Sequence, residues 1–209
     1  MFTLRNSFVL RAAMFDYFLV LDFEATCHRH IKLNPQEIIE FPVIKVNGKT
    51  FETESEFHEY VQPYINKKLT PFCTELTGIS QEMIENKKHL EEVLQDFQLW
   101  MEKEVLLKPK VKFAFVTCGD WDLKKMLPSE CKYFNISYPE YMTSWINIKK
   151  SFAQLFHLER PRDLVGMLEY LNLTLIGRHH SGIDDCRNIV RILQAMAEKN
   201  YRFYINGKL

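Results

Sequence analysis

The sequence contains no apolar run near the roughly 20 residues that a membrane-spanning helix requires, so we expect no membrane segment. Glycine and proline are scarce, with 7 and 8 residues in 209, and no stretch rich in Gly, Pro or Ser divides the chain. The length and the 46% hydrophobic content favour one substantial core over two. These properties predict a single, monomeric domain over residues 15–209.

The sequence also lacks an excess of charge, because 27 Lys and Arg residues balance 27 Asp and Glu residues. No global positive field therefore indicates a polyanion partner. The balance does not exclude nucleic acid, since bound metal ions would make an acidic site more positive than the residue count implies.

The sequence has five cysteines, an odd number, and lacks any C-x-x-C motif. This spacing favours reduced thiols in an intracellular protein of the cytoplasm, the nucleus or both. The segment Cys27–His30 lacks the second ligand pair that a structural zinc site needs. Met1–Met14, with two arginines and no acid, is interpreted as an N-terminal leader expected to be disordered; an organelle-targeting segment is the alternative.

Apolar patterning predicts strands that come early and helices that are interleaved and late, which is typical of an α/β layer fold. Asn47-Gly48 predicts a hairpin after the second strand. The expected strands are Phe18–Asp22, Ile38–Val46, Glu56–Val61 and Lys110–Thr117, and the expected helices are Leu90–Glu104, Trp121–Leu127, Ile146–Phe156, Asp163–Leu171 and Ile183–Lys199.

Two acids follow the first predicted strand at a spacing that places them on one face. Asp22 and Glu24 are two residues apart, directly after the apolar run that ends at Leu21. Crowding two buried carboxylates requires a proton or a cation in compensation. The alternative is that the strand has ended and both carboxylates point into water.

Further acids begin two predicted helices. Asp120 is placed to cap the helix that follows it, whereas Asp122 lies four residues before Met126 on the core-facing side and is the better ligand candidate. Asp185 continues the apolar stripe of the last helix, and Asp184 falls about 100° away as a solvated or capping acid. A buried Arg or Lys partner is the alternative to a metal at Asp185.

Four inward-facing acids without a matching set of cations indicate a divalent metal site. Carboxylate oxygens favour Mg²⁺ or Mn²⁺ over zinc. His180, on a loop held by Gly182 five residues before Asp185, adds a base beside the acids; a surface histidine is the alternative.

These residues resemble the DEDDh exonucleases, and most of all the histone-mRNA 3′-exonuclease (enhanced-RNAi exoribonuclease) branch. Five ordered motifs carry the resemblance across Tyr17–Phe203. They are Asp22–Thr26, Gln36–Pro42, Glu75–Ile79, Trp121-Asp122 and His180–Asp185.

The resemblance implies an RNase H-like exonuclease fold, a mixed five-stranded sheet flanked by helices. It implies two Mg²⁺ ions, with Mn²⁺ as a substitute, and an activity that removes 5′-mononucleotides from single-stranded RNA 3′ ends. It assigns metal binding to Asp22, Glu24, Asp122 and Asp185, and the general base to His180, with Glu24 also counted as catalytic. The adjacent His179 departs from the family pattern.

The same resemblance implies that the terminal base and sugar are held by Phe23, Ala25, Thr26, Leu76, Thr77 and Ile79. Trp121, beside Asp122, is interpreted as a base-stacking or a core residue. With His180, these residues are the expected substrate-binding set. Two other functions remain open: a DNA exonuclease with the same metal chemistry, and a non-catalytic module that binds RNA ends or a protein.

Overall fold

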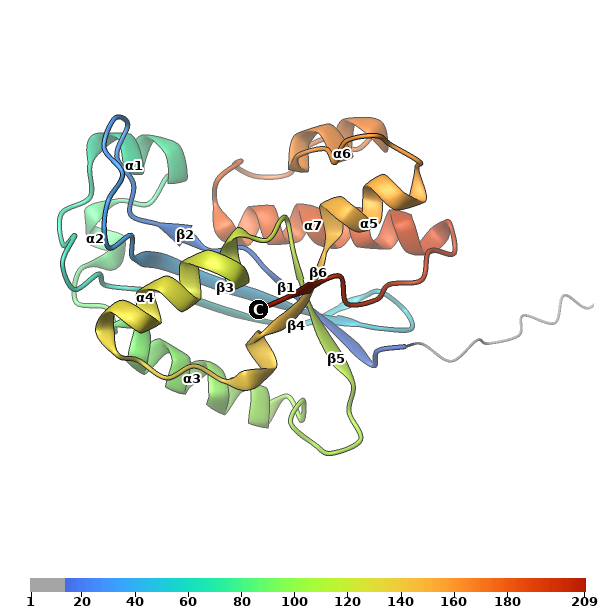
Figure 1. The fold of residues 1–209 in the computed structure, drawn as a ribbon, viewed down its shortest axis with the longest axis horizontal. Helices are drawn as coiled ribbons and strands as arrows, with labels where there is room; N and C mark the ends of the chain where they lie inside the picture. Colours follow the sequence, from blue (N-terminus) through green and yellow to red (C-terminus); the bar gives the residue numbers. More distant parts are fainter. Residues whose placement is uncertain (1–13) are drawn as a thin grey trace, which may run out of the picture.

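A computed structural model describes residues 14–209, which form one mixed sheet between two layers of helices (Figure 1). The leader predicted for residues 1–14 lies outside the described residues, apart from Met14. The strands are β1 (Tyr17–Leu21), β2 (Glu24–Ala25), β3 (Ile38–Asn47), β4 (Thr53–Tyr60), β5 (Phe113–Thr117), β6 (Ser144–Asn147) and β7 (Gly207–Lys208). The helices are α1 (Pro71–Thr77), α2 (Gln81–Ile84), α3 (Leu90–Lys103), the π-helix η1 (Asp122–Met126), α4 (Leu127–Phe134), the 3₁₀-helix η2 (Glu140–Met142), α5 (Ile148–Leu155), α6 (Leu164–Tyr170) and α7 (Gly182–Glu198).

Strand β1 lies at the centre of the sheet. It pairs antiparallel with β3 and parallel with β5, and β6 continues the parallel side. Strands β2 and β4 pair with β3, and β7 pairs antiparallel with β6. The predicted mixed sheet is confirmed, but it has seven strands rather than five. The additional β2 and β7 are two residues long, too short to produce a periodic pattern.

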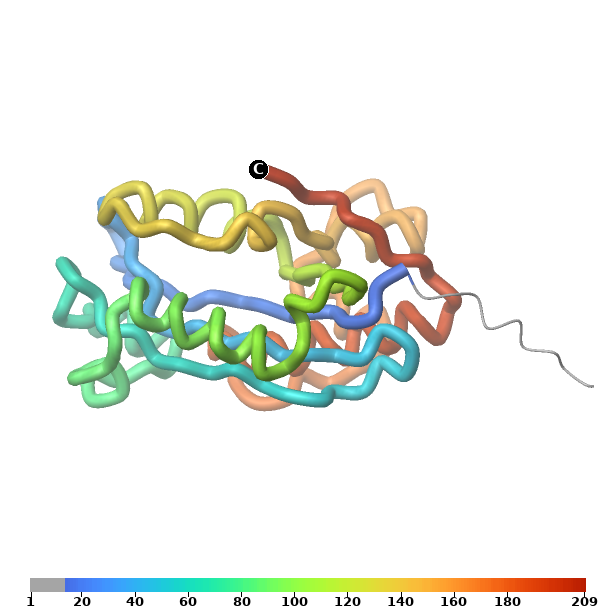
Figure 2. The backbone as a smooth tube through the Cα atoms, turned by 90° about the horizontal axis from the view of Figure 1, so that it is seen from below, coloured from blue at the N-terminus to red at the C-terminus, as the bar shows by residue number. Residues whose placement is uncertain are grey.

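Alternation along β1 divides the core between the two faces of the sheet. Leu19 and Leu21 pack in the cluster that contains Phe97 of α3. Phe18 and Val20 pack in the other cluster, with the apolar faces of α5, α6 and α7. Figures 1 and 2 show α3 and α7 on opposite sides of the strands. Both faces of β1 are therefore covered, as its continuous apolar run predicts.

The hairpin predicted at Asn47-Gly48 is present, with β4 beginning at Thr53 rather than Glu56. The Asn47 side chain accepts hydrogen bonds from the N–H groups of Lys49 and Thr50, which stabilises the turn.

The predicted helix Ile146–Phe156 is wrong at its start. Trp145 and Ile146 pair with β5, and helix α5 begins only at Ile148. The Asn147 side chain caps α5 by accepting from the N–H groups of Lys149 and Lys150. Apolar spacing did not separate this short buried strand from the helix that follows it without a loop.

Among the helices of residues 14–209, none is both long and apolar enough to cross a bilayer.

Glu130 of α4 is an acid buried between this helix and the start of β3. Its carboxylate accepts a 2.7 Å hydrogen bond from the Ile38 N–H at the start of β3, and its exposed fraction is 1%. Burial, together with the nearby charge of Glu37, raises the pKa of Glu130 to about 8. The side chain therefore holds its proton at neutral pH and joins α4 to the sheet as a neutral group.

Replacing Glu130 by Gln should remove one source of pH dependence in stability. Because the folded pKa is about 8 and the ordinary value is 4.5, the folded protein retains a proton that the unfolded chain releases between these pH values. The stabilisation that proton binding by Glu130 adds to the free energy of unfolding is fully present below pH 4.5. It falls by up to ~1.4 kcal/mol per pH unit as pH rises to about 8. Urea unfolding in EDTA should show a gentler decline for Glu130→Gln; an unchanged pH profile would contradict this assignment.

Candidate active site

Three predicted metal ligands meet at one end of the sheet. Asp22 directly follows β1, Glu24 lies in β2, and Asp185 lies in the first turn of α7. Each offers a carboxylate oxygen, and these atoms all lie within 4.8 Å of one another. The predicted proximity of Asp22 and Glu24 and the predicted inward direction of Asp185 are confirmed, although β1 ends at Leu21 and the two acids do not share one continuous strand.

The electrostatics of this cluster are those of crowded acids. Burial raises the pKa of Asp22 well above its ordinary value, and the charges of Asp122, Glu24 and Asp185 raise it further. Burial and the charge of Glu40 raise the pKa of Glu24 to about 9. Burial also raises the pKa of Asp185, against hydrogen bonds that lower it. A divalent cation would relieve this repulsion, and an all-oxygen donor set fits Mg²⁺ or Mn²⁺.

Asp122 lies beside this cluster rather than within it. Its Oδ1 atom accepts a 3.0 Å hydrogen bond from the N–H of Phe23, the residue between Asp22 and Glu24. The side chain is buried, which confirms its predicted inward direction, although the helix around it is a π-helix. Burial raises the pKa of Asp122 to about 6. Single-turn π-helices often occur at functional sites, because the wider turn redirects one side chain.

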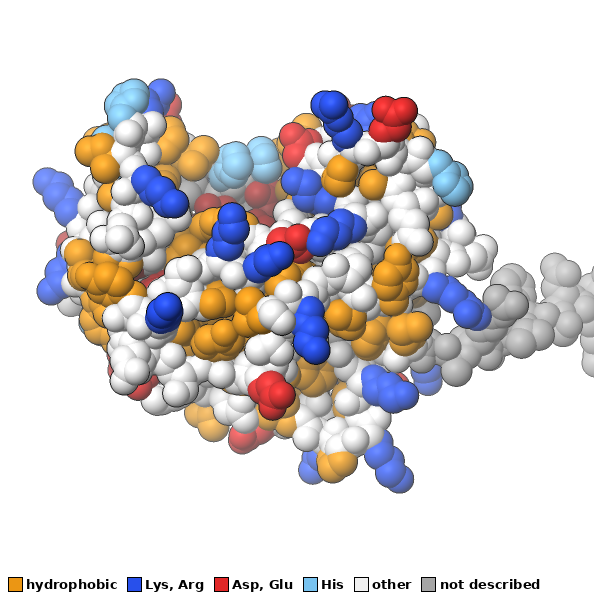
Figure 3. Space-filling view, viewed as in Figure 1, with side chains coloured by type: hydrophobic (Ala, Val, Ile, Leu, Met, Phe, Trp, Pro, Cys, Tyr) orange, Lys and Arg blue, Asp and Glu red, His pale blue; other side chains and the backbone are white. Residues whose placement is uncertain are grey.

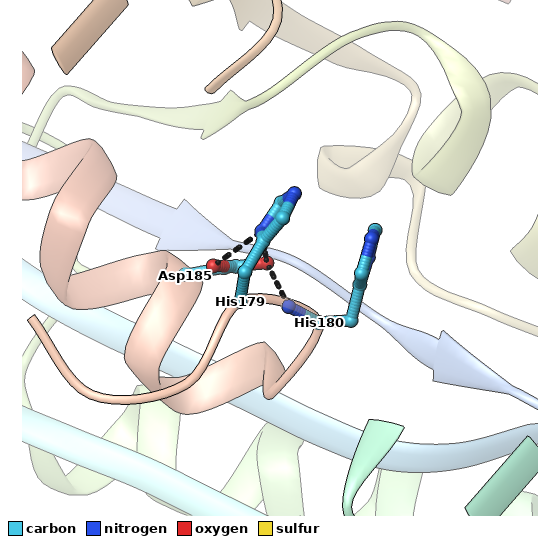
Figure 4. A group of neighbouring side chains, drawn as sticks. All are labelled: His179, His180 and Asp185. Carbon is cyan, nitrogen blue, oxygen red and sulfur yellow. Dashed lines mark hydrogen bonds and ion pairs between the residues drawn. The ribbon is translucent and has the colours of Figure 1, made fainter. Parts of the chain in front are cut away.

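The two histidines make different contacts with Asp185 (Figure 4). The His179 Nδ1 atom lies 3.2 and 3.1 Å from the two carboxylate oxygens, whereas His180 donates its backbone N–H at 2.9 Å. Their rings stack with centroids 3.9 Å apart. The His180 ring makes no hydrogen bond with Asp185, although one ring nitrogen lies within 4.8 Å of a carboxylate oxygen of Asp185. Partial desolvation, and then His179, lower the pKa of His180, so that its imidazole is neutral near pH 7.

Glu40 of β3 joins the site to the start of α7. Its carboxylate accepts hydrogen bonds from the N–H groups of Gly182 (2.9 Å) and Ile183 (3.2 Å), and it contacts His58 Nε2 at 2.8 Å. These are the free amides of the first helical turn, where a negative charge is favourable. A Cβ atom on Gly182 would lie 2.6 Å from the Asp22 carbonyl oxygen, so only glycine lets α7 approach this closely.

Sequence reasoning did not single out Glu40 or His58. The available signal was an acid inside the otherwise apolar run Ile38–Ile44, because a buried acid needs a specific partner. Glu40 also stands directly opposite Glu24 in the strand pairing.

The predicted capping role of Asp120 is wrong. Its carboxylate accepts from Trp145 Nε1 (3.0 Å), Asn147 Nδ2 (2.9 Å) and Lys150 Nζ (2.7 Å) instead of from amides of the following helix. Hydrogen bonding to these donors lowers the pKa of Asp120 against the opposing effect of burial. The carboxylate thus joins the β5–η1 turn to β6 and α5. Asp184 accepts from the Arg178 N–H and pairs with Arg187.

The residues predicted to grip the substrate differ in exposure. Trp121 is 39% exposed and His180 is exposed, while Leu76 is half-buried. Thr26 and Thr77 use their hydroxyl groups internally, with the Glu37 N–H and with the Cys73 carbonyl and Ile79 N–H. The side chains of Phe23, Ala25, Thr26, Thr77 and Ile79 are buried. A substrate would therefore meet these five chiefly through backbone atoms.

The face that carries the site is hollowed. In Figure 3, histidine side chains lie in a hollow between two raised parts of the surface, with acidic side chains beneath them. Lys and Arg side chains gather on the surface next to this hollow (Figure 3). The arrangement combines an acidic floor, which suits metal ions, with a basic margin, which suits phosphates.

The fold and site define a class of protein: an RNase H-like α/β fold with a carboxylate cluster and a histidine at one end of the central strand. A family model described as Exonuclease matches residues 19–193. The chain is 51% identical over 194 residues to human ERI1 exoribonuclease 3, covering 93% of this chain and 57% of the relative. It is 38% identical over 200 residues to human 3′-5′ exoribonuclease 1, covering 93% and 56%.

Solved structures agree with these matches. The nuclease domain of 3′hExo bound to rAMP, described as a DEDDh family member, has a TM-score of 0.90 at 37% identity, over 95% of this chain and 100% of that one. A 3′-exonuclease described with a histone mRNA stem-loop also has a TM-score of 0.90 at 37% identity, over 94% and 68%. The chain belongs to the exonuclease family. It spans less than two thirds of the length of these two curated relatives.

Removing the Glu40 carboxylate should loosen the start of α7. Glu40→Ala leaves the N–H groups of Gly182 and Ile183 without their acceptor, which costs roughly 1–3 kcal/mol for a buried group. We expect a lower free energy of unfolding in urea and faster hydrogen exchange at the start of α7. Glu52→Ala, in the exposed β3–β4 turn, is the control. Equal hydrogen-exchange rates at the start of α7 in the two variants would show that Glu40 does not hold the helix.

Proposed function

We propose that this chain is a metal-dependent 3′-to-5′ exoribonuclease that releases 5′-mononucleotides from single-stranded RNA ends. The observation that carries the proposal is the convergence of Asp22, Glu24 and Asp185 to within 4.8 Å in a member of the exonuclease family. Two relatives that align with 93% of this chain are named exoribonucleases, which supports RNA as the substrate.

The carboxylate set would hold the metal ions. Asp22, Glu24 and Asp185 would supply oxygen ligands to one ion, with Asp22 shared, and Asp122 would serve the second from its position beside the cluster. A bound pair of divalent ions would lower the pKa of the attacking water and neutralise the phosphate and the departing oxygen. We propose Mg²⁺, with Mn²⁺ as a substitute, because every proposed protein ligand is a carboxylate.

His180 would act as the general base. Its ring is exposed on the loop before α7, and its lowered pKa keeps the imidazole neutral and able to accept a proton near pH 7. The water would lose a proton to His180 and attack the terminal phosphodiester, and the 3′-oxygen of the shortened RNA would leave. Asp185 would orient the loop by accepting the His180 N–H. Neighbouring His179 contacts Asp185 directly and is thus engaged in a way that His180 is not.

The substrate's 3′ nucleotide would lie between the β1–β2 segment and the end of α1. Backbone atoms of Phe23, Ala25 and Thr26, with the Leu76–Ile79 segment, would hold its base and sugar, and the partly exposed Trp121 would stack on a base. We further propose a monomer in a reducing intracellular compartment, the cytoplasm or the nucleus. All five cysteines of the sequence lie among the described residues, and each is a free thiol.

Purified protein with Mg²⁺ should shorten a 5′-labelled single-stranded RNA to a ladder from the 3′ end. The Asp22→Ala variant and an EDTA control should both lose this activity, because the ligand shared by the two proposed ions, or the ions themselves, would be gone. An equal-length DNA strand tests substrate class and should be shortened more slowly. Intact RNA with both Mg²⁺ and Mn²⁺ would favour the non-catalytic binding module instead.

Substitutions of His179 and His180 should have different effects on the rate of RNA cleavage. His180→Ala should lower kcat by about 10²–10⁴-fold, the usual contribution of a general base, with Mg²⁺ binding retained. His179→Ala should keep a much larger share of the wild-type rate, because that ring contacts Asp185 rather than standing free. A near wild-type rate for His180→Ala, or a greater loss for His179→Ala, would reassign the base.

A further inference from the structure

A cavity of about 380 Å³ lies beside the proposed active site, and of its lining residues only Trp121 has a role in the function proposed above. One wall is the helical segment that begins with Trp121, next to the proposed ligand Asp122. The opposite wall is the segment 32–36, which leads from β2 to β3. Both walls therefore continue directly from elements that carry metal-site residues. The volume falls within the range of cavities that bind small ligands.

The helical wall presents one row of side chains to this cavity. Trp121, Lys125, Ser129 and Tyr133 are spaced four residues apart, and all four line the cavity. Trp121 is 39% exposed and Tyr133 is 52% exposed, and the Tyr133 ring meets the Phe134 ring in an edge contact with centroids 5.0 Å apart. An aromatic side chain with an open face offers a stacking platform to any nucleobase.

The charge around the cavity has one sign. Lys125 and, across from it, Lys32 are exposed lining residues, and none of the ten residues that line the cavity is acidic. Among the ion pairs within residues 14–209, neither lysine takes part in one. This differs from Lys150, whose ammonium group is held by Asp120. Lys32 and Lys125 are thus available to phosphate oxygens.

We propose that this cavity is a subsite for an upstream nucleotide of the same RNA strand whose 3′ end occupies the metal site. Its base stacks on Tyr133, and Lys32 and Lys125 contact the flanking phosphates. The stacking is tolerant of sequence, since every base has an aromatic face. The subsite rests on the proposed exoribonuclease function and adds a second point of attachment, so that the strand stays aligned while the terminal nucleotide is removed.

The test is an abasic scan with the full chain and Mg²⁺. A 5′-labelled ten-nucleotide RNA is prepared intact and with a single abasic residue at each position from the second to the sixth from the 3′ end, and release of the first nucleotide is measured. For the wild type, kcat/KM should fall about fivefold or more at one upstream position, in line with the loss of one stacked base. On intact RNA, Tyr133→Ala should reduce kcat/KM by a similar factor. For this variant, an abasic residue at the sensitive upstream position should reduce kcat/KM almost no further.

Non-additivity of this kind identifies the base that Tyr133 contacts, which a general structural defect would not do. Lys32→Ala and Lys125→Ala should each reduce the slope of log KM against log salt by about one. Leu99→Ala and Lys110→Ala, which remove an exposed apolar side chain and an exposed charge elsewhere, are the matched controls and should behave as wild type.

Two failures are distinguishable. If the wild type shortens RNA but Tyr133→Ala shows the full abasic loss at every position, the subsite is overturned and the exoribonuclease function stands. If the wild type shortens no RNA with Mg²⁺ or Mn²⁺, the proposed function itself fails, and the subsite fails with it.

Discussion

The repulsion among buried carboxylates at one end of β1 is the constraint on which the rest of this structure depends. Burial raises the pKa values of Asp22, Glu24, Asp122 and Asp185, and the charges of neighbouring acids raise those of Asp22 and Glu24 further. Such a cluster opposes folding unless protons or cations compensate its charge. The fold therefore retains a local source of instability at the point where we propose that metal ions bind.

Hydrogen bonds from backbone amides offset part of the free-energy cost of burying these acids, and they also fix where the carboxylates lie. The Phe23 N–H holds Asp122, the His180 N–H holds Asp185, and the first amides of α7 hold Glu40. The bonds of Asp122 and Glu40 join segments far apart in the sequence, and the bond of Asp185 joins α7 to the loop that precedes it. Satisfying the carboxylates and assembling the cluster are consequently one process, since each hydrogen bond that lowers the cost of burial also fixes the position of an acid at this end of the sheet.

Much of this site followed from periodicity in the sequence. Alternation after β1 placed Asp22 and Glu24 together, and the apolar stripe of α7 turned Asp185 inward, because both patterns are local. Glu40 could not be assigned in this way, since the amides it binds lie more than 140 residues along the chain. The capping role expected of Asp120 failed for the same reason, because its partners Trp145 and Lys150 come from β6 and α5. The two-residue strands β2 and β7 depend on their neighbours and have no pattern of their own.

The π-helix η1 carries a consequence for how this protein can change. Its wider turn accommodates one residue more than an α-helix would, so that Asp122 faces the site while Leu127, five residues later, still begins the core-facing row of α4. Losing one residue here would turn everything on one side of the gap by about 100° relative to the other. Either the acid would leave the site or Leu127 and Cys131 would leave the core. In this segment, length is as strictly constrained as chemistry, and insertions or deletions are expected to be tolerated far less than substitutions.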